Sequence, residues 1–214
     1  LIKSKISPKS KKSFLSKLNK NKAYKILDVG SGNNSPILTK EILPNSIYTG
    51  IDIKPYEKYD LEFIDTYIQS NPIKFSNDIF SLNNKFDIVI SSHNLEHCND
   101  WRNTLFAMVS VLETNGLLYL SLPSERSINF PCREGTLNYF DDETHKKDVI
   151  TFNELVSEFN KYDLKLLFST KSYKPYFMVF IGFILEPLSI FLKKVLPGTW
   201  ALYGFETIFI LKKK

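Results

Sequence analysis

A short apolar segment that runs into a glycine turn constrains the fold of this chain most. Residues Tyr24–Val29 read YKILDV, and Gly30-Ser31-Gly32 follows directly. An apolar run of this length is typical of a buried strand, and the glycines allow the sharp turn that ends it. We therefore predict a buried strand here, with a tight turn at its carboxyl end.

Strand and helix patterns alternate along the rest of the chain. We predict three helices, at Ser35–Leu43 with Ser35 as N-cap, at Trp101–Leu112 closed by Asn115-Gly116, and at Thr151–Phe159. The predicted strands that follow the first one are Ser46–Ile53, a strand near Ile73–Phe75, Phe86–Ser91, Gly116–Leu122, Leu164–Phe168 and Thr207–Leu211. In a chain of 214 residues, this alternation favours a single α/β domain with a mostly parallel sheet and helices on both faces.

The net charge of +5 is concentrated at the N-terminus. Residues 1–25 carry nine lysines and no acidic residue, whereas the rest of the chain is net acidic. We expect a basic arm over residues 1–22 and the folded domain over residues 23–214. Such an arm can bind nucleic acid or anionic lipid, but a solvated lead-in to the domain is the simpler interpretation. The two cysteines cannot form a disulfide scaffold, which indicates a cytoplasmic location.

Two carboxylates stand at the ends of the first two predicted strands. Asp28 precedes the glycine turn, and Asp52 ends the second strand, where a carboxylate can accept hydrogen bonds from both hydroxyls of a ribose. The third glycine of a dinucleotide-binding turn is absent, and Asp28 would repel a pyrophosphate, so a nicotinamide cofactor is disfavoured. Asp28 suits a cation, such as a sulfonium cofactor that carries an amino acid.

The segments ILDVGSG, YTGIDI, NDIFSL, FDIVISSHNLEH and NGLLYLSLP occur in this order. The ordered set resembles the class I S-adenosylmethionine-dependent methyltransferases, close to their type 11 and type 23 domains. The resemblance implies a Rossmann-like, seven-stranded sheet whose last strand, at Glu206–Leu211, is antiparallel, and S-adenosylmethionine as methyl donor. It further implies that the cofactor is bound by Asp28, Gly30, Ser31 and Gly32 at its methionine end, by Asp52 at the ribose, by Ile53 and Asp78 at the adenine, and by Ser92 and His93 at the reacting end.

The residues after the strand Phe86–Ser91 limit the chemistry further. Methyltransferases of this class that act on exocyclic amino groups usually carry an Asn/Asp-Pro-Pro-aromatic motif at this position. This chain reads Ser91-Ser92-His93-Asn94 instead. The difference argues against methylation of the amino groups of adenine or cytosine. His93–His97 also matches the H-x-x-E-H pattern of zinc enzymes, but that pattern needs a helix and a third ligand. The adjacent carboxylates Asp141-Asp142 also lack identifiable partner ligands. We therefore predict no metal site and expect His97 to face the substrate.

Residues 123–150 follow the fifth predicted strand and are expected to form a loop that covers the substrate. Arg126 and Arg133 suit a phosphate or carboxylate group of that substrate. His145 or Asp142 is placed as general base for a hydroxyl acceptor. A solvated loop is the alternative interpretation for each of these residues.

The most apolar stretch, Tyr176–Leu192, lies in an insert over residues 174–200. It falls short of the roughly 20 residues that span a bilayer, and Glu186-Pro187 interrupts it. We expect this insert to cap the acceptor site, so that a lysine at Phe180 or Ile184 would impair methyl transfer, or to form the face of a homodimer. The alternative is a helix that lies on the inner face of the membrane near a lipid-linked substrate.

Together these features predict a methyltransferase that acts on a small-molecule or lipid-linked acceptor, with a sugar of a surface polysaccharide as the preferred example. Two alternatives stay open. One is an RNA methyltransferase that uses the basic arm, although nucleic acid is not the favoured partner. The other is a nucleotide-binding module without catalysis, which would keep Asp52 but turn over no donor.

Overall fold

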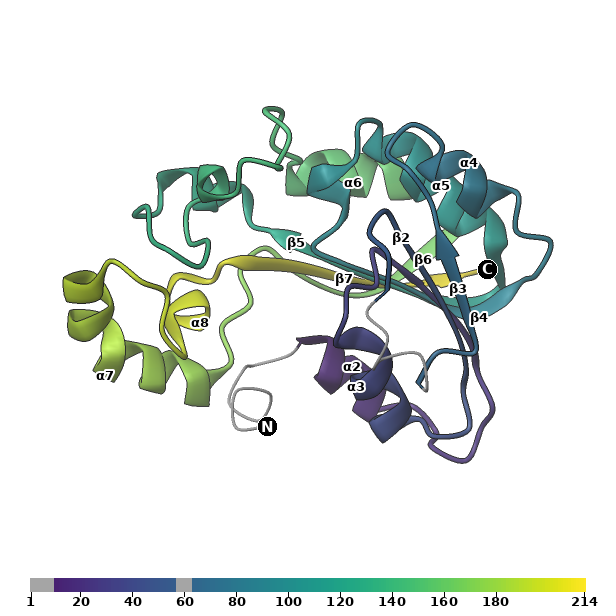
Figure 1. The fold of residues 1–214 in the computed structure, drawn as a ribbon, viewed down its shortest axis with the longest axis horizontal. Helices are drawn as coiled ribbons and strands as arrows, with labels where there is room; N and C mark the ends of the chain where they lie inside the picture. The colour runs from purple at the N-terminus through teal and green to yellow at the C-terminus, as the bar shows by residue number, and fades with distance from the viewer. Residues whose placement is uncertain (1–9, 57–62) are drawn as a thin grey trace.

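A seven-stranded sheet forms the centre of the protein in the computed structural model, which describes residues 10–56 and 63–214 (Figure 1). The strand order is β3-β2-β1-β4-β5-β7-β6. Every neighbouring pair is parallel except the two pairs that contain β7, which is antiparallel to β5 and to β6. The strands are β1 (Lys25–Val29), β2 (Ile47–Asp52), β3 (Thr66–Gln69), β4 (Phe86–Ser92), β5 (Leu112–Pro123), β6 (Leu164–Thr170) and β7 (Glu206–Lys213). The predicted fold class, with its antiparallel last strand, is confirmed.

Helices cover both faces of the sheet, as Figure 1 shows. One face carries α2 (Ser10–Ser16) and α3 (Ser35–Ile42), and the other carries α4 (Phe75–Phe80), α5 (Trp101–Val111) and α6 (Phe152–Phe159). A hydrophobic core lies on each face of the sheet, and successive residues of β1 point into opposite cores. Ile26 packs in the core that contains Phe14 of α2, and Leu27 packs in the core that contains Met108 of α5. This period of two is what a strand buried on both faces requires.

The capping signals of two helices have different outcomes. At α6, the Thr151 hydroxyl accepts from the Glu154 N–H (3.2 Å) and the Glu154 carboxylate accepts from the Thr151 N–H (3.0 Å), so the predicted capping box is confirmed. At α3, the N-cap is Asn34, and Ser35 is the first helical residue. The expectation of a Ser35 cap is wrong because its hydroxyl donates to the Asp28 carboxylate instead.

Two predicted boundaries also need correction. The third strand is Thr66–Gln69, whereas Ile73 lies 88% exposed before α4. An edge strand that pairs only with β2 needs little apolar surface, so hydrophobicity alone did not locate it. Helix α5 ends at Val111, and Asn115 (φ 67°) lies within β5, where the register with β4 shifts. Asn115-Gly116 therefore belongs to an irregularity of the strand rather than to the end of the helix.

Part of the predicted basic arm belongs to the folded domain. Helix α2 buries Phe14 and Leu15 against the sheet, and the Phe14 ring stacks on Tyr119 with centroids 5.2 Å apart. Residues 1–9 lie outside the described part of the chain. The predicted boundary between residues 22 and 23 is therefore wrong for the described residues, since the packed domain already includes α2.

The segment before β7 forms a separate helical projection. Helix α7 (Tyr176–Leu192) and the short α8 (Thr199–Tyr203) lie together beyond one end of the sheet, in the green and yellow part of Figure 1. The two helices lie so close together that a Cβ at Gly182 would come within 2.3 Å of the Gly198 carbonyl oxygen. Among the described residues, no helix combines the length and hydropathy needed to cross a membrane.

Candidate functional site

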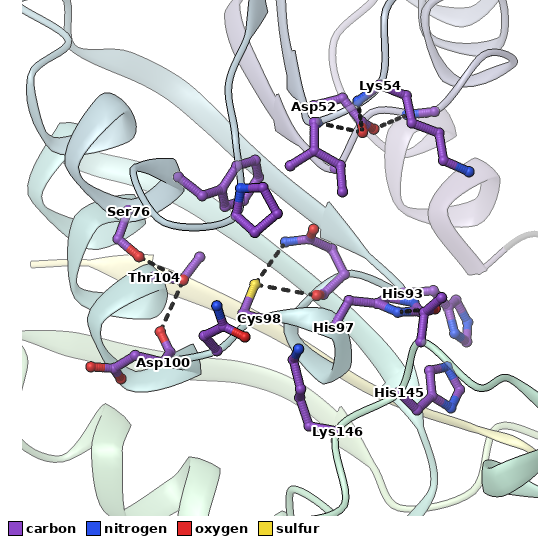
Figure 2. A pocket seen from close by; sticks show the side chains of 18 of the residues that line it. Asp52, Lys54, Ser76, His93, His97, Cys98, Asp100, Thr104, His145 and Lys146 are labelled. Atoms are coloured by element: carbon purple, nitrogen blue, oxygen red, sulfur yellow. Dashed lines mark hydrogen bonds between the residues drawn. The ribbon is translucent and has the colours of Figure 1, made fainter.

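A cavity of about 1030 Å³ opens at the carboxyl ends of β1, β2 and β4. Its walls are the glycine turn after β1, the residues after β2 and β4, the first turns of α4 and α5, and residues 142–146 of the cover loop. Figure 2 shows Asp52 and Lys54 on one side of this cavity, and His97, His145 and Lys146 on another. Parallel α/β sheets bind their ligands at this edge because the loops there leave a crevice.

The glycine turn packs closely against Asn94 and contains a buried polar atom without a partner among the described residues. Gly30 has φ 72°, and a Cβ at this position would lie 2.5 Å from the Asn94 side-chain oxygen. The Ser31 hydroxyl is buried and has no hydrogen-bond partner among the described residues. A buried hydroxyl without a partner is costly unless a ligand supplies the bond. Gly30, Ser31 and Gly32 all line the cavity, as the methyltransferase resemblance implied.

Asp52 stands at the end of β2 with its carboxylate held by backbone groups. Its Oδ2 accepts from the Gly32 N–H (3.0 Å), and its Oδ1 accepts from the N–H groups of Ile53 (2.7 Å) and Lys54 (3.2 Å). A carboxylate has about four acceptor positions, so a position on Oδ2 stays available for a ribose hydroxyl. Asp52 and Ile53 therefore lie where the sequence placed them, in the wall of the cavity.

Asp28 has a different environment from the one expected. Its buried carboxylate accepts from the Lys11 ammonium (2.5 Å), from the Tyr48 hydroxyl (2.5 Å) and from Ser35. Burial and the negative charge of Asp28 raise the pKa of Tyr48 well above its ordinary value. Asp28 lines a second cavity of about 190 Å³ beside the first, not the main one. Lys11 thus supplies a cation beside Asp28, and the expected contact of Asp28 with the cofactor's methionine end stays a prediction.

Asp78 also differs from its expected role at the adenine. Its carboxylate accepts from the Ser70 hydroxyl (2.6 Å), and it is not among the residues that line the cavity. The neighbouring Asn77 lines the cavity instead, together with Ile73 and Phe75. The sequence reasoning did not assign Ile73 and Phe75 to the site because it placed a strand there, and it chose Asp78 of the NDIF segment rather than the adjacent Asn77.

His93 lines the cavity as expected, but its ring is already engaged. Its Nε2 lies 3.0 Å from Glu206, its Nδ1 lies 3.3 Å from Glu96, and its ring stacks on Phe205 (centroids 6.0 Å apart). Burial lowers the pKa of His93, but the two carboxylates outweigh burial and raise it to about 10. The side chain therefore acts as a fixed cation rather than as a free base. Ser92 also lines the cavity, and its hydroxyl bonds to Ser121 (2.8 Å).

A pair of histidines forms another part of the cavity wall. The rings of His97 and His145 have centroids 4.7 Å apart, although one comes from the short 3₁₀ turn η2 (Leu95–His97) and the other from the cover loop. The Thr144 hydroxyl donates to Asp142 (2.6 Å) and so accepts from His97 Nδ1 (2.9 Å). The His145 Nδ1 donates to the Tyr139 carbonyl oxygen (2.6 Å). Both Nε2 atoms consequently carry lone pairs when the rings are neutral.

Asp142 supports this pair and is a weak base itself. Burial raises the pKa of Asp142, but hydrogen bonds from Thr144 outweigh burial and hold it below its ordinary value. The cover loop thus brings the expected residues His145 and Asp142 to the same cavity as His97. The H-x-x-E-H segment follows the end of β4 and finishes in a 3₁₀ turn, not in the helix of a zinc protease.

The two arginines of the cover loop lie elsewhere. The Arg133 guanidinium is buried and donates to Glu186 (2.6 Å) and Ser189 (2.6 Å), so it fastens the loop to α7. Arg126 is exposed, and neither arginine lines either cavity. The contacts of Arg133 with α7 do not support its expected contact with substrate, and the expected contact of Arg126 stays a prediction.

Helix α7 lines neither cavity. Trp200, at the end of the insert, does line the second cavity, and its ring centroid lies 5.5 Å from that of His93. That the insert caps the acceptor site stays a prediction.

Comparisons with known proteins agree with this geometry. The sequence profile of a methyltransferase domain family, type 23, matches residues 5–170. No curated protein sequence matches the chain. A SAM-dependent methyltransferase from Archaeoglobus fulgidus is 19% identical with a TM-score of 0.54, and the alignment covers 89% of this chain and 86% of that chain.

Two further similar structures were solved with S-adenosylhomocysteine bound. The N-methyltransferase NodS from Bradyrhizobium japonicum WM9 is 14% identical, with a TM-score of 0.58 over 97% of this chain and 88% of that one. The 1,6-didemethyltoxoflavin-N1-methyltransferase from Burkholderia thailandensis, also with 1,6-didemethyltoxoflavin bound, is 12% identical, with a TM-score of 0.61 over 100% and 81%. At such identities the structures show the fold alone. The family profile covers most of the chain, and the chain therefore belongs to the methyltransferase domain family and is an S-adenosylmethionine-dependent methyltransferase.

Proposed function

We propose that this methyltransferase transfers the methyl group of S-adenosylmethionine to a hydroxyl of a small-molecule or lipid-linked acceptor. The observation that carries the proposal is the pair of Nε2 lone pairs on His97 and His145 in the wall of the cavity. A hydroxyl is a weak nucleophile until its proton leaves, and a group that accepts a hydrogen bond from the hydroxyl favours that loss. An amine acceptor needs no such assistance once it is neutral.

The cavity has room for both reactants. Gly30, Ser31 and Asp52 form the donor end, and the two histidines form the acceptor end of the same space of about 1030 Å³. In the reaction the acceptor oxygen attacks the methyl carbon, the C–O bond forms and the C–S bond breaks. The sulfonium becomes a neutral thioether, and the hydroxyl proton leaves at the histidine end. Because the sulfonium is already activated, alignment of the two reactants is the main task of the protein.

Sugars are the acceptor class that we prefer. The histidine end of the cavity presents the carboxylates of Asp142 and Glu143, and such groups accept hydrogen bonds from neighbouring sugar hydroxyls. The experiment is a turnover assay that measures S-adenosylhomocysteine against nucleotide sugars and polyprenyl-linked sugars. Each acceptor is paired with its O-methylated form as a control. Turnover with the free hydroxyl and none with the blocked one supports the proposal, and methyl transfer only to amines contradicts it.

Helix α7 carries a second part of the proposal, a peripheral contact with anionic lipid on the cytoplasmic face of the membrane. Its aromatic side chains are 62–94% exposed, and exposed lysines flank it at Lys174 and Lys193. Burying one such side chain is worth roughly 1.5–3 kcal/mol, so a face of several requires a partner. The lysines at the two ends of the helix favour a negatively charged surface as the partner. The exposed aromatic residues are Tyr176, Phe177, Phe180, Phe183 and Phe191.

Flotation with liposomes of phosphatidylglycerol and phosphatidylethanolamine tests the lipid contact. We expect the full chain to float and the Phe180→Lys variant not to. Phe80→Lys, on α4, is the matched control, because Phe80 is also exposed (56%) but lies on another helix. Flotation that survives Phe180→Lys, or a dimer in sedimentation that this variant dissolves, would contradict the lipid contact.

The RNA alternative has weaker support from the described residues. Lys11 is buried against Asp28, and Phe14 and Leu15 anchor α2 in the core, so much of the basic segment is not a free arm. Absence of salt-sensitive RNA binding by the intact chain would remove this alternative, since phosphate contacts make affinity depend steeply on salt.

A further inference from the structure

We propose that Glu96, His97 and His145 bind a divalent transition-metal ion, and that this ion holds the acceptor hydroxyl. The second half rests on the proposed hydroxyl acceptor, whereas the first half stands on the geometry alone. One ligand atom from each of the three side chains lies within 4.8 Å of the other two. An ion with bonds of about 2.0–2.2 Å places its ligand atoms roughly 3–4.4 Å apart. Small side-chain rotations therefore close the site.

The hydrogen bonds of the two histidines prepare them as metal ligands. His97 Nδ1 donates to Thr144, which in turn donates to Asp142, and His145 Nδ1 donates to the Tyr139 carbonyl oxygen. These contacts fix both tautomers so that the Nε2 lone pairs are available. Metal-binding histidines typically donate their other N–H to a carbonyl, carboxylate or similar acceptor, which orients the ring and increases its basicity.

Glu96 supplies an independent observation. Its side chain is 1% exposed, and neither of its oxygens accepts a hydrogen bond from the described residues. Its charged neighbour is His93, whose Nδ1 lies 3.3 Å from Oε1, and His93 is shared with Glu206. Even when His93 carries a full positive charge, one cation faces two carboxylates. A buried carboxylate with free lone pairs is costly without further compensation, and a bound cation would provide it.

The set of ligands indicates the class of ion. Two imidazoles and one carboxylate suit Mn²⁺, Fe²⁺, Co²⁺ or Zn²⁺, whereas Mg²⁺ and Ca²⁺ prefer oxygen ligands. Three protein ligands leave coordination positions open for a substrate oxygen. Because His97 and His145 line the donor cavity, an ion between them would face the space where the methyl group is transferred. Figure 2 shows the two side chains next to each other at this wall.

An ion on the two Nε2 lone pairs leaves neither free to accept the hydroxyl proton, so the metal would act in their place, as a Lewis acid on the acceptor. Coordination lowers the pKa of a bound hydroxyl, whose proton passes to water in the open cavity. The oxygen then attacks the methyl carbon, the C–O bond forms, and the C–S bond electrons return to sulfur, which leaves as the neutral thioether. The three side chains keep their charges through this step.

Metal titrations of the untagged full chain, stripped with a chelator, test the site. The chain contains three histidines, so few other imidazole sites compete. We expect one Co²⁺ per chain with a visible spectrum of nitrogen and oxygen ligation, and calorimetric binding of Zn²⁺ and Mn²⁺. Each of His97→Ala, His145→Ala and Glu96→Gln should weaken binding at least about tenfold. Asp148→Asn, which removes an exposed carboxylate of the same loop, should leave it unchanged. Binding of S-adenosylhomocysteine reports that each variant is folded.

The outcomes separate this inference from the proposed acceptor. Absence of stoichiometric binding, or binding that survives in the His97→Ala/His145→Ala double variant, overturns the metal site. Full methyl transfer by the stripped enzyme overturns the role of the ion. Metal binding that is lost when Glu96, His97 or His145 is substituted supports the site even if no hydroxyl acceptor is methylated. In that case the acceptor class proposed above is the part that is wrong.

Discussion

The ammonium of Lys11 lies 2.5 Å from the carboxylate of Asp28, and both side chains are buried. This ion pair joins α2, at the start of the described chain, to the strand that carries the glycine turn. Removing one partner of a buried pair leaves an uncompensated charge, which typically costs about 3–5 kcal/mol. We expect Lys11→Met to lower the free energy of unfolding by that order in denaturant titration. Lys12→Met, at the exposed neighbouring lysine, should have little effect, and equal losses would contradict the role of the pair.

Gly30 and Gly32 offer a matched test of the turn. Both have positive φ (72° and 55°), but a Cβ at Gly30 meets Asn94 at 2.5 Å, whereas a Cβ at Gly32 meets no atom within 4 Å. Each alanine substitution should cost about 1–2 kcal/mol of backbone strain. Only Gly30→Ala adds the steric clash, so we expect it to be clearly the less stable variant in thermal unfolding. Equal stability of the two would show that Asn94 moves freely.

The Arg133–Glu186 contact should stabilise the protein in a pH-dependent manner. The hydrogen bonds from Arg133 hold the pKa of Glu186 below its ordinary value of 4.5, although burial opposes them. A carboxylate whose pKa is lowered by folding contributes stability above about pH 4.5, and this contribution is lost as the pH falls through the lowered pKa. Glu186→Gln should therefore destabilise the protein at pH 7 and less at pH 3. A destabilisation that does not change with pH would contradict this account.

Methyl transfer should depend on His145 more than on Asp142. His145→Ala removes one of the two groups that present lone pairs to the acceptor, and we expect a loss of about 10²–10⁴ in kcat. Asp142→Asn keeps a hydrogen-bond acceptor for Thr144 and should cost less. Affinity for S-adenosylhomocysteine should be unchanged in both, because the donor end of the cavity is formed by other residues. A larger loss with Asp142→Asn would identify Asp142 as the base.

The sequence placed Gly30, Gly32 and Asp52 in one crevice, and the physical reason is local. All three follow directly from two buried strands, so one-dimensional patterns bring them together. The contact of Asp28 with Lys11 was not foreseen, because Lys11 comes from a segment whose lysines indicated a solvated arm. The edge strand Thr66–Gln69 was missed because its polar residues give no strong period.

The acceptor end depended on contacts that sequence spacing does not reveal. His97 and His145 lie side by side because the cover loop contacts the 3₁₀ turn after β4, where the Lys146 N–H donates to the Glu96 carbonyl oxygen, and a contact between such distant segments is not visible in the sequence. Arg133 was assigned to substrate from its residue type alone, whereas its partner Glu186 lies in the apolar insert. Long-range ion pairs of this kind decide whether a charged residue faces a ligand or the protein.

Calorimetric titration of S-adenosylhomocysteine into the wild-type chain and into Asp52→Ala tests the central claim most directly. We predict binding of S-adenosylhomocysteine and S-adenosylmethionine, no binding of NAD, and a loss of about 1–3 kcal/mol on Asp52→Ala because charge-assisted hydrogen bonds to the ribose are removed. Asp87→Asn, at a carboxylate that contacts Lys22 and the Lys25 backbone N–H outside the cavity, is the control and should bind as wild type. Equal affinity of the wild type and Asp52→Ala, or binding of NAD in place of S-adenosylhomocysteine, would contradict the account.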